Sequence, residues 1–366
     1  MDEPTNMADR IGVSMKRVLA AVILAGLSLG LGGVAKTLDI YFIDVEGGQS
    51  TLIVTPAGET LLVDAGYGPR NGRGAGSTAP GRDPDRILAA AKDAHVDHID
   101  YLMVTHFHPD HAGGVPDLAA RIPIRTFIDY GAPLGTDRMA TGTYRAYDPV
   151  RGAHPHLLPQ PGDRLPIQGV DADIMSVDGL VISKPNRGAG QVNPACSTVE
   201  EQEPDGTENF RSLGVRIQFG AFRFLDLGDL MGNSLASTVC PRNLLGEAEV
   251  YLVPHHGNYD SNVPAVLAAV KPRVAIMNNG ATKGGDPDSF ATLRQQRTLE
   301  DLWQLHRSTN KNAANSPDQL IANVDEGESA YWIKLTATSD GDFTVFNSRT
   351  GFTKAYAGKR KAIPVH

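Results

Sequence analysis

Residues 99–111 read IDYLMVTHFHPDH, and this stretch decides the fold. The apolar run over residues 99–105 predicts a buried strand, and three histidines and an aspartate follow at its carboxyl end. Open α/β sheets place their functional groups beyond this end of the strands. The stretch therefore predicts an α/β domain whose chemistry lies at the end of this strand.

The segment His106-Phe107-His108-Pro109-Asp110-His111 is a dense set of metal donors. Alternate side chains of an extended segment point the same way, so His106 and His108 can bind one metal ion. The turn that follows brings Asp110 and His111 to a second ion. We therefore expect a dinuclear site, with ordinary surface or core histidines as the alternative.

Two other predicted strands also end in donor residues. One ends in Leu225-Asp226-Leu227-Gly228-Asp229, where Asp229 at the tip can bridge two metal ions. Asp226 lies inside the apolar run, which favours a structural role. The other is followed by Val253-Pro254-His255-His256-Gly257. Three strand ends thus carry the candidate chemistry.

The rest of the chain predicts strands and helices in alternating blocks. Strands are expected at residues 38–45, 51–55, 60–63, 125–129, 172–177, 213–219, 222–227, 250–253, 273–277, 329–336 and 343–346. Helices are expected at residues 83–94, 115–121, 263–270 and 298–306, with Asp83 as the N-cap of the first. Residues 131–169 and 183–209 are expected to be loops. This order predicts a two-layer sheet sandwich covered by helices.

The net charge of the 366-residue chain is −8, and its pI is near 5.8. This balance argues against a broad basic surface for nucleic acid, so a polyanionic substrate has to be held by metal ions or a few cations. Lys184 and Arg187 are candidates for neutralising a phosphate, with solvated loop charges as the alternative.

The N-terminal 35 residues have the layout of a signal peptide. Lys16 and Arg17 precede an uncharged apolar run over residues 18–34 that ends in small residues. An uncleaved membrane anchor is the alternative. We expect a secreted or periplasmic protein, with residues 36–366 as one domain. Cys196 and Cys240 can then form a disulfide that stabilises the fold by about 3 to 4 kcal/mol, with two unpaired core cysteines as the alternative.

The combination of motifs resembles the metallo-β-lactamase fold superfamily, and within it the hydrolase domain of the DNA-uptake competence proteins. Besides the donor segment at residues 106–111, the matching motifs are Phe42-Ile43-Asp44-Val45, Gly47-Gly48-Gln49-Ser50, Leu62-Val63-Asp64-Ala65-Gly66, Gly228-Asp229-Leu230, and His255-His256-Gly257 with Ser261. The resemblance covers residues 38–287. It implies an α/β (α+β) fold, a four-layer αββα sandwich of two mixed β-sheets flanked by helices.

The resemblance also implies a ligand set: His106 and His108 for a first ion, Asp110 and His111 for a second, and Asp229 as the bridge. One histidine of the 255/256 pair completes the second site. We expect this to be His255, because it leaves the strand first, with His256 as a substrate-facing neighbour or general acid. Asp64 resembles the acidic residue that orders the metal-binding loop and is not a ligand.

The chain departs from the competence-type pattern in two places. Residues 46–49 read Glu-Gly-Gly-Gln where those proteins usually have Gly-Gln-Gly-Asp. The histidine that the superfamily supplies as a further first-site ligand has no clear counterpart. His154 and His156 are candidates for it, with exposed loop histidines as the alternative. His306 is expected in a C-terminal helix, as a capping or surface residue.

These motifs predict an exported metal-dependent hydrolase that uses a hydroxide activated by two zinc ions, with Asp110 and His256 as catalytic residues. Manganese and ferrous iron are the alternative metals. The expected substrate is a phosphodiester or a related ester, and a lactonase or β-lactamase-type amide or ester hydrolase is the alternative. A non-catalytic metal-binding protein that retains the fold is a further alternative. Membrane contact is expected only if the leader stays uncleaved.

Overall fold

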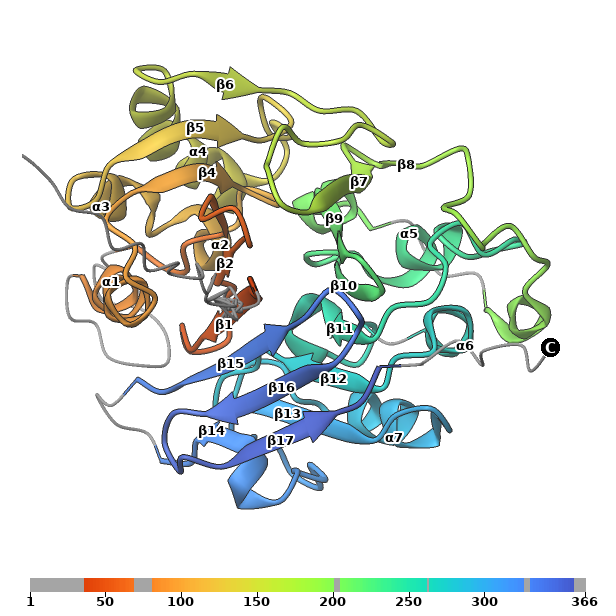
Figure 1. Cartoon of the computed structure of the whole chain (residues 1–366). Coiled ribbons are helices and arrows are strands. Elements are labelled where there is room, and N and C mark those ends of the chain that lie inside the picture. Colours follow the sequence, from red (N-terminus) through yellow and green to blue (C-terminus); the bar gives the residue numbers. More distant parts are fainter. Residues whose placement is uncertain (1–35, 69–80, 201–204, 262, 326–329, 359–366) are drawn as a thin grey trace, which may run out of the picture. The chain divides into compact units, whose positions relative to one another are not determined.

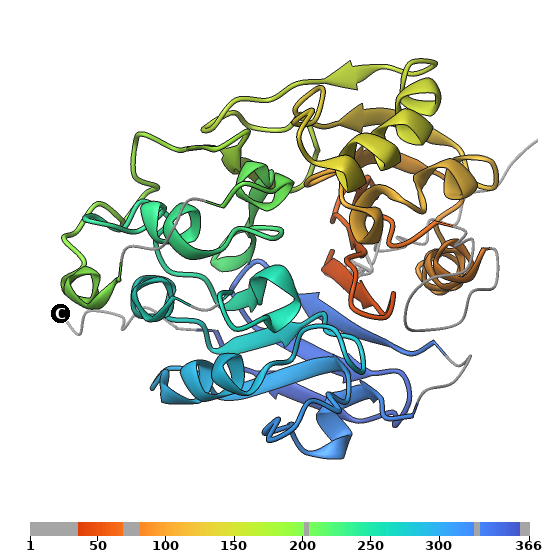
Figure 2. The same cartoon turned by 180° about the vertical axis from the view of Figure 1, so that it is seen from behind.

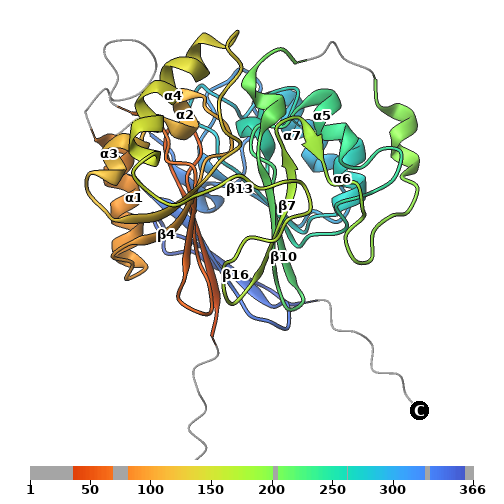
Figure 3. The same ribbon diagram turned by 90° about the horizontal axis from the view of Figure 1, so that it is seen from above.

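The computed structural model describes residues 36–68, 81–200, 205–261, 263–325 and 330–358. The predicted leader at residues 1–35 lies outside the described residues. In the described part, two mixed β-sheets pack face to face, with helices on their outer faces (Figure 3). The predicted α/β four-layer sandwich is confirmed. None of the described helices is long and apolar enough to cross a membrane.

The first sheet contains, in spatial order, β17 (Thr353–Tyr356), β16 (Phe343–Asn347), β15 (Trp332–Ala337), β1 (Leu38–Ile43), β2 (Thr51–Val54), β3 (Thr60–Val63), β4 (Ile99–Met103), β5 (Ile124–Ile128) and β6 (His156–Leu157) (Figure 1). Strands β17 to β3 pair antiparallel, and β3 to β6 pair parallel. The parallel half carries the donor segment at the end of β4.

The second sheet contains, in spatial order, β14 (Ile321–Asn323), β13 (Asp301–His306), β12 (Val274–Met277), β11 (Val250–Leu252), β10 (Phe222–Asp226), β9 (Gly214–Phe219), β7 (Asp171–Val177) and β8 (Leu180–Val181). Strands β14 to β10 pair parallel, and β10, β9, β7 and β8 pair antiparallel. Its parallel half delivers the second and third donor groups at the ends of β10 and β11.

The helices cover the outer faces of both sheets, as the view from behind also shows (Figure 2). The first sheet is covered by α1 (Arg82–Asp93), α2 (Pro109–Ala112), α3 (Val115–Ala119) and α4 (Arg138–Arg151). The second is covered by α5 (Gly232–Ser237), α6 (Pro264–Val270) and α7 (Pro287–Gln295). Short 3-10 helices lie at η1 (Pro194–Thr198), η2 (Glu208–Arg211), η3 (Pro254–Gly257) and η4 (Asp318–Leu320).

The largest apolar cluster fills the space between the two sheets, because alternate residues of each strand face inward. In β1, Leu38, Ile40 and Phe42 belong to this cluster. Tyr41 and Ile43 of the same strand pack under the helices of the first sheet. A third cluster lies between the second sheet and α5 to α7. This alternation fixes which face of each strand is buried.

One of the four helix predictions is wrong. Residues 298–306 contain strand β13, which pairs parallel with β12, and the helix of this region is α7. Trp303 and Leu305 face the inter-sheet core while Leu302 faces the helices, so the run has no clear helical or strand period. His306 is consequently a buried strand residue and not a helix cap.

The predicted loop over residues 131–169 contains the 14-residue helix α4. Its interior Gly142 and Pro149 hid the helical pattern, although Asp137 is a regular N-cap whose Oδ1 accepts from the backbone N–H groups of Met139 and Ala140.

The N-cap prediction for Asp83 is also wrong. Gly81 caps α1 in a left-handed conformation, and the carboxylate of Asp83 accepts a hydrogen bond from the N–H of Tyr67 at 2.7 Å.

The predicted disulfide is confirmed, since Cys196 and Cys240 are bonded with their Cα atoms 5.7 Å apart. It ties η1 to the segment after α5 and closes a loop over a sequence separation of 44 residues. Stable disulfides are typical of oxidising compartments.

Candidate metal centre

Donor side chains from both sheets meet at one end of the sandwich. The segment after β4 supplies His106, His108, Asp110 and His111. Asp229 follows β10, and His256 lies in η3 after β11. These side chains are buried, and the exposed fraction of none of them exceeds 8%. The three predicted donor groups thus lie together, because each follows the carboxyl end of a strand.

Four of these donors form a group that fits one metal ion: Asp110, His111, Asp229 and His256. The Nε2 atom of His111 lies 3.4 Å from Oδ2 of Asp110, 3.3 Å from Nε2 of His256 and 3.1 Å from Oδ2 of Asp229. The Nε2 atom of His256 lies 3.2 Å from Asp110 and 3.3 Å from Asp229. Tetrahedral zinc with bonds of about 2.0 to 2.2 Å needs ligand atoms about 3.3 to 3.6 Å apart. The spacing of the donors fits such an ion.

His106 and His108 form a second donor pair beside this group. Nε2 of His106 lies 3.0 Å from Nδ1 of His108 and 3.8 Å from Oδ2 of Asp229. The other oxygen of Asp229, Oδ1, is buried and has no hydrogen-bond partner among the described residues. An orphaned buried carboxylate oxygen is costly unless a ligand occupies it. Asp229 therefore lies within reach of both groups of donors.

The second ring nitrogens of two histidines are held by carboxylates. Nδ1 of His111 lies 2.7 Å from Oδ2 of Asp64, which also accepts from the hydroxyl of Thr105 at 2.7 Å. Nε2 of His108 lies 2.9 Å from Oδ2 of Asp137. Metal-binding histidines are commonly oriented in this way, because the carboxylate fixes the tautomer that leaves the other nitrogen free for the ion. Asp64 has the position that the resemblance implied for it.

We expect Asp137→Asn to weaken binding of the ion held by His106 and His108 about 10- to 100-fold. Asparagine keeps the N-cap of α4, so the change removes the charged partner of His108 without breaking the helix. Competition with a coloured zinc chelator measures the affinity. Asp148→Asn, on the exposed side of the same helix, is the matched control. Equal affinities in the two variants would show that Asp137 does not orient His108.

The structure places His256, and not the predicted ligand His255, beside the other donors. Both residues have left-handed backbone conformations, with φ of 49° and 58°, and this turn sends their side chains in different directions. His256 is fully buried among the donors, whereas Nδ1 of His255 contacts Asp260 at 3.1 Å and Nε2 contacts the amide of Asn209 at 3.3 Å. Order along the chain does not fix the direction of a side chain in such a turn, and the geometry favours His256 as the ligand over the predicted His255.

Charges around the site keep its carboxylates ionised, while Asp229, Asp110 and Asp64 outweigh burial and raise the pKa of His111 well above its usual range. Burial alone would raise the pKa of Asp110, but Lys283 and His111 outweigh it and hold that pKa well below its usual range. Burial likewise opposes ionisation of Asp229, and His111 and His256 lower its pKa well below the usual range. Burial lowers the pKa of His106, which keeps its imidazole neutral. Carboxylates and neutral imidazoles are the forms that bind metal.

A cavity of about 690 Å³ opens onto these donors. Its lining includes Tyr67, His108, Asp110, Met139, Thr207, Asn209, Asp229, His255 and Lys283. Lys283 lies on the loop after β12, where its ammonium contacts Oδ2 of Asp110 and lies 3.4 Å from the hydroxyl of Tyr67. The sequence analysis missed Lys283, although it follows a predicted strand of the parallel sheet as Asp229 and His256 do.

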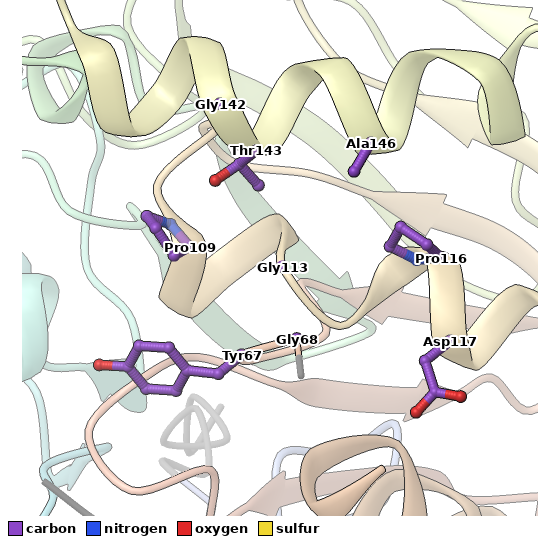
Figure 4. Close-up of a pocket in the computed structure, with 9 residues that line it drawn as sticks. All are labelled: Tyr67, Gly68, Pro109, Gly113, Pro116, Asp117, Gly142, Thr143 and Ala146. Carbon is purple, nitrogen blue, oxygen red and sulfur yellow. The ribbon is translucent and has the colours of Figure 1, made fainter. Parts of the chain in front are cut away.

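A second cavity, of about 380 Å³, adjoins the first and shares Tyr67 and Pro109 with it. Figure 4 shows these two residues at one end and Pro116 with Asp117 at the other. Its roof is helix α4, where Gly142 and Ala146 present little side-chain volume. The lining is mostly apolar, so this cavity has room for an uncharged part of a substrate.

The two histidines proposed for the missing first-site ligand lie elsewhere. His154 is exposed and packs against the ring of Phe127, and His156 lies 2.9 Å from Asp129 at the edge of the first sheet. Nδ1 of His106 lies 3.1 Å from the hydroxyl of Thr105 and 3.5 Å from that of Ser212. The first pair of histidines therefore has no third histidine partner in the described part of the chain.

The altered motif at residues 46–49 has a structural role. Gly48 has no room for a side chain, because a Cβ there would lie 2.4 Å from the carbonyl oxygen of Asp110. The side chain of Gln49 donates to Asp226 at 2.9 Å, and Asp226 accepts from the N–H of Gly228. Asp226 thus supports the turn before Asp229, in keeping with the structural role predicted for it.

Comparison with known proteins gives a family match over part of the chain. The model of the metallo-beta-lactamase superfamily matches residues 43–192. A search of curated proteins finds no significant match. The fold is similar to that of a metallo-β-lactamase HARLDQ motif mutant from Cronobacter sakazakii, at 16% identity and a TM-score of 0.31, over 52% of this chain and 61% of that one. The chain thus spans less than two thirds of that protein.

Two further structures are similar to this chain. CmlA, a diiron β-hydroxylase from Streptomyces venezuelae, is 13% identical with a TM-score of 0.38, over 68% of this chain and 46% of that one. The metallo hydrolase Igni18 from Ignicoccus hospitalis is 13% identical with a TM-score of 0.40, over 73% of this chain and 94% of that one. The residues that match the metallo-beta-lactamase model include the donor segment at residues 106–111, so this part of the chain is similar to the metallo-β-lactamase superfamily.

Proposed function

We propose that this protein hydrolyses phosphodiesters or related esters at a centre of two zinc ions. The observation that carries the proposal is the position of Asp229. Its Oδ2 lies 3.1 to 3.8 Å from nitrogens of His111, His256 and His106, and its Oδ1 is free of hydrogen bonds to the described residues. A carboxylate placed between two donor groups suits a pair of metal ions, which favours in-line displacement at phosphorus.

In this proposal Asp110, His111, Asp229 and His256 hold one ion, and His106, His108 and Asp229 hold the other. Two such ions supply Lewis acid stabilisation and lower the pKa of water towards neutrality. The protein orients these ligands through Asp64 and Asp137. His255 lines the cavity beside them, fixed by Asp260, and takes the substrate-facing role that was predicted for His256.

Lys283 favours an anionic substrate. Its side chain is 35% exposed and lines the cavity, so the ammonium can reach a substrate as well as Asp110. When Asp110 binds an ion, its negative charge is shared with that ion and Lys283 is left to attract another anion. A non-bridging phosphate oxygen is such a partner.

We expect Lys283→Met to raise KM for bis-p-nitrophenyl phosphate about tenfold, since one charge-assisted contact is lost. KM for an uncharged lactone is expected to stay the same. Steady-state kinetics on both substrates measures the difference, with Lys271→Met, an exposed lysine on the second sheet's side, as the matched control. A rise of the same size for both substrates would argue against a role in binding the anion.

The proposed function is tested by comparing turnover of bis-p-nitrophenyl phosphate, a lactone and nitrocefin by the zinc-loaded, manganese-loaded and iron-loaded protein. We expect the diester to be the best substrate and chelation to abolish its turnover. Faster cleavage of the lactone or of nitrocefin would assign the protein to the alternative ester or amide hydrolases. Two bound ions without turnover of any of the three would favour a metal-binding role.

We also propose that the protein works outside the cytoplasm, in the periplasm or as a secreted protein. The disulfide between Cys196 and Cys240 supports this location, because such bonds persist in oxidising compartments. The proposed partners are small-molecule or phosphoester substrates.

A further inference from the structure

Arg216 is a buried arginine without a partner. It lies in β9, where its neighbours Val215 and Ile217 face the core between the sheets, so Arg216 faces the outer side of the second sheet. Its exposed fraction is 5%. Its guanidinium makes no hydrogen bond or ion pair with any residue that the structure describes, and its Nε atom is fully buried without a partner.

Nearby carboxylates do not neutralise Arg216. Asp173 lies directly opposite it across the β7–β9 pair, but its two oxygens bind Arg164 at 2.7 and 3.2 Å. Asp171, the next outward residue of β7, also binds Arg164, at 2.6 Å. The two carboxylates nearest to Arg216 on β7 are therefore paired with Arg164. Burial and the nearby Arg223 lower the pKa of Arg216, which reflects the cost of keeping this charge.

Arg216 lines a cavity of about 580 Å³ together with Lys184 and Arg187. These two exposed cations were the sequence candidates for neutralising a phosphate, and they lie here and not at the cavity of the metal centre. The two cavities share no lining residue. The lining contains four cations, Arg164, Lys184, Arg187 and Arg216, against three carboxylates, Asp163, Asp171 and Asp173.

A buried charge without a partner costs several kcal/mol unless a ligand compensates it. In this cavity Arg216 is the buried cation, and Lys184 and Arg187 are exposed cations on the loop after β8. Guanidinium groups bind phosphate oxygens through paired, charge-assisted hydrogen bonds, and lysine adds a point charge.

We propose that this cavity is a second ligand site, separate from the metal centre, that binds a phosphate group. Arg216 is its central donor, and Lys184 and Arg187 close over the ligand from the loop. The site needs no metal ion and does not depend on the proposed function, because none of its residues contacts the metal donors.

Inorganic phosphate is the probe for this site. Calorimetry on the zinc-loaded protein at constant ionic strength, with chloride as the reference anion, counts the phosphate ions bound and measures Kd. We expect Arg216→Met to remove one phosphate-binding event, or to weaken it at least about tenfold, and Arg216→Lys to keep part of it. Arg125→Met, an arginine with an exposed side chain on the first sheet, is the matched control.

Thermal unfolding separates binding from folding. Wild-type protein is expected to gain a few degrees in Tm with saturating phosphate, and Arg216→Met to lose this gain. Without phosphate, Arg216→Met is expected to be at least as stable as the wild type, since it removes an unpaired buried charge. Phosphate binding that is the same in the wild type and Arg216→Met would overturn the proposal. So would the absence of any phosphate response in the wild type together with a destabilised variant.

The effect of phosphate on diester turnover distinguishes the second site from the metal centre. If phosphate also inhibits diester turnover at the metal centre, this inhibition is expected to persist in Arg216→Met and to weaken in Lys283→Met. Loss of the calorimetric event in Lys283→Met and not in Arg216→Met would place phosphate at the metal centre and contradict the second site.

Discussion

Replacing Asp229 by asparagine is expected to lower kcat for bis-p-nitrophenyl phosphate by about 10²- to 10³-fold and to reduce the bound metal from two ions to one or none. Asp229 is the donor that lies within reach of both groups of histidines, and asparagine retains its size but not its charge. Steady-state kinetics and metal analysis of the same preparation measure the two effects together.

Asp226→Asn is the matched control for this change. Asp226 lies three residues earlier and is equally buried, but its oxygens accept from Gln49 and from the N–H of Gly228 and contact no histidine. We expect this variant to keep two ions and to retain activity within about tenfold of the wild type. Full metal occupancy and normal turnover in Asp229→Asn would refute the bridging role.

Asp64→Ala is expected to lower the free energy of unfolding by about 3 to 5 kcal/mol and to weaken metal binding about 10- to 100-fold. Asp64 is completely buried, and its carboxylate accepts from the N–H and hydroxyl of Thr105 and contacts Nδ1 of His111. Alanine removes the partner of the Thr105 N–H and leaves the Thr105 hydroxyl and Nδ1 of His111, 3.2 Å apart, with only each other and His106 nearby in the described part of the chain. Urea unfolding of the metal-free protein measures the first effect, and chelator competition measures the second.

The backbone of Asp64 is left-handed, with φ of 60°, so part of the loss of stability will come from placing alanine there. Asp178 has φ of 53° and a half-exposed side chain, which makes Asp178→Ala the control for this backbone term. Equal losses of unfolding free energy in Asp64→Ala and Asp178→Ala would mean that the hydrogen bonds of Asp64 contribute little to stability.

Most of the strands could be predicted because they alternate or run apolar between turn residues. The strand at residues 60–63 was predicted with the bounds that the structure gives, and the hairpin of β9 and β10 within a residue at each end. The prediction failed where a strand is buried on both faces, as in β13, and where glycine and proline interrupt a helix, as in α4. In both cases packing against other elements decides the structure, and local pattern does not.

The donor set could be predicted because strand ends of a parallel sheet lie close together. The direction of individual side chains could not be predicted, since it depends on turn geometry such as the two left-handed residues of η3. Two supporting residues, Asp137 and Lys283, were missed for a similar reason. Asp137 lies 29 positions from His108 and Lys283 lies 173 positions from Asp110, so only the packed fold shows that they touch. The ligand roles of the donors, and the supporting roles of Asp137 and Lys283, stay predictions that metal-binding measurements test.

The donors of the metal centre are also far apart in the order of synthesis. His111 contacts Asp229, 118 positions later, and His256, 145 positions later. His111 follows a strand of the first sheet, and Asp229 and His256 follow strands of the second. Loops of this length close late in folding, because their entropy must be lost before the contact forms. A chain interrupted before residue 256 would lack a donor of the four-ligand group. Since β12 to β17 follow residue 256, acquisition of the ion would report that the ends of β4, β10 and β11 have been brought together, and not that either sheet is complete.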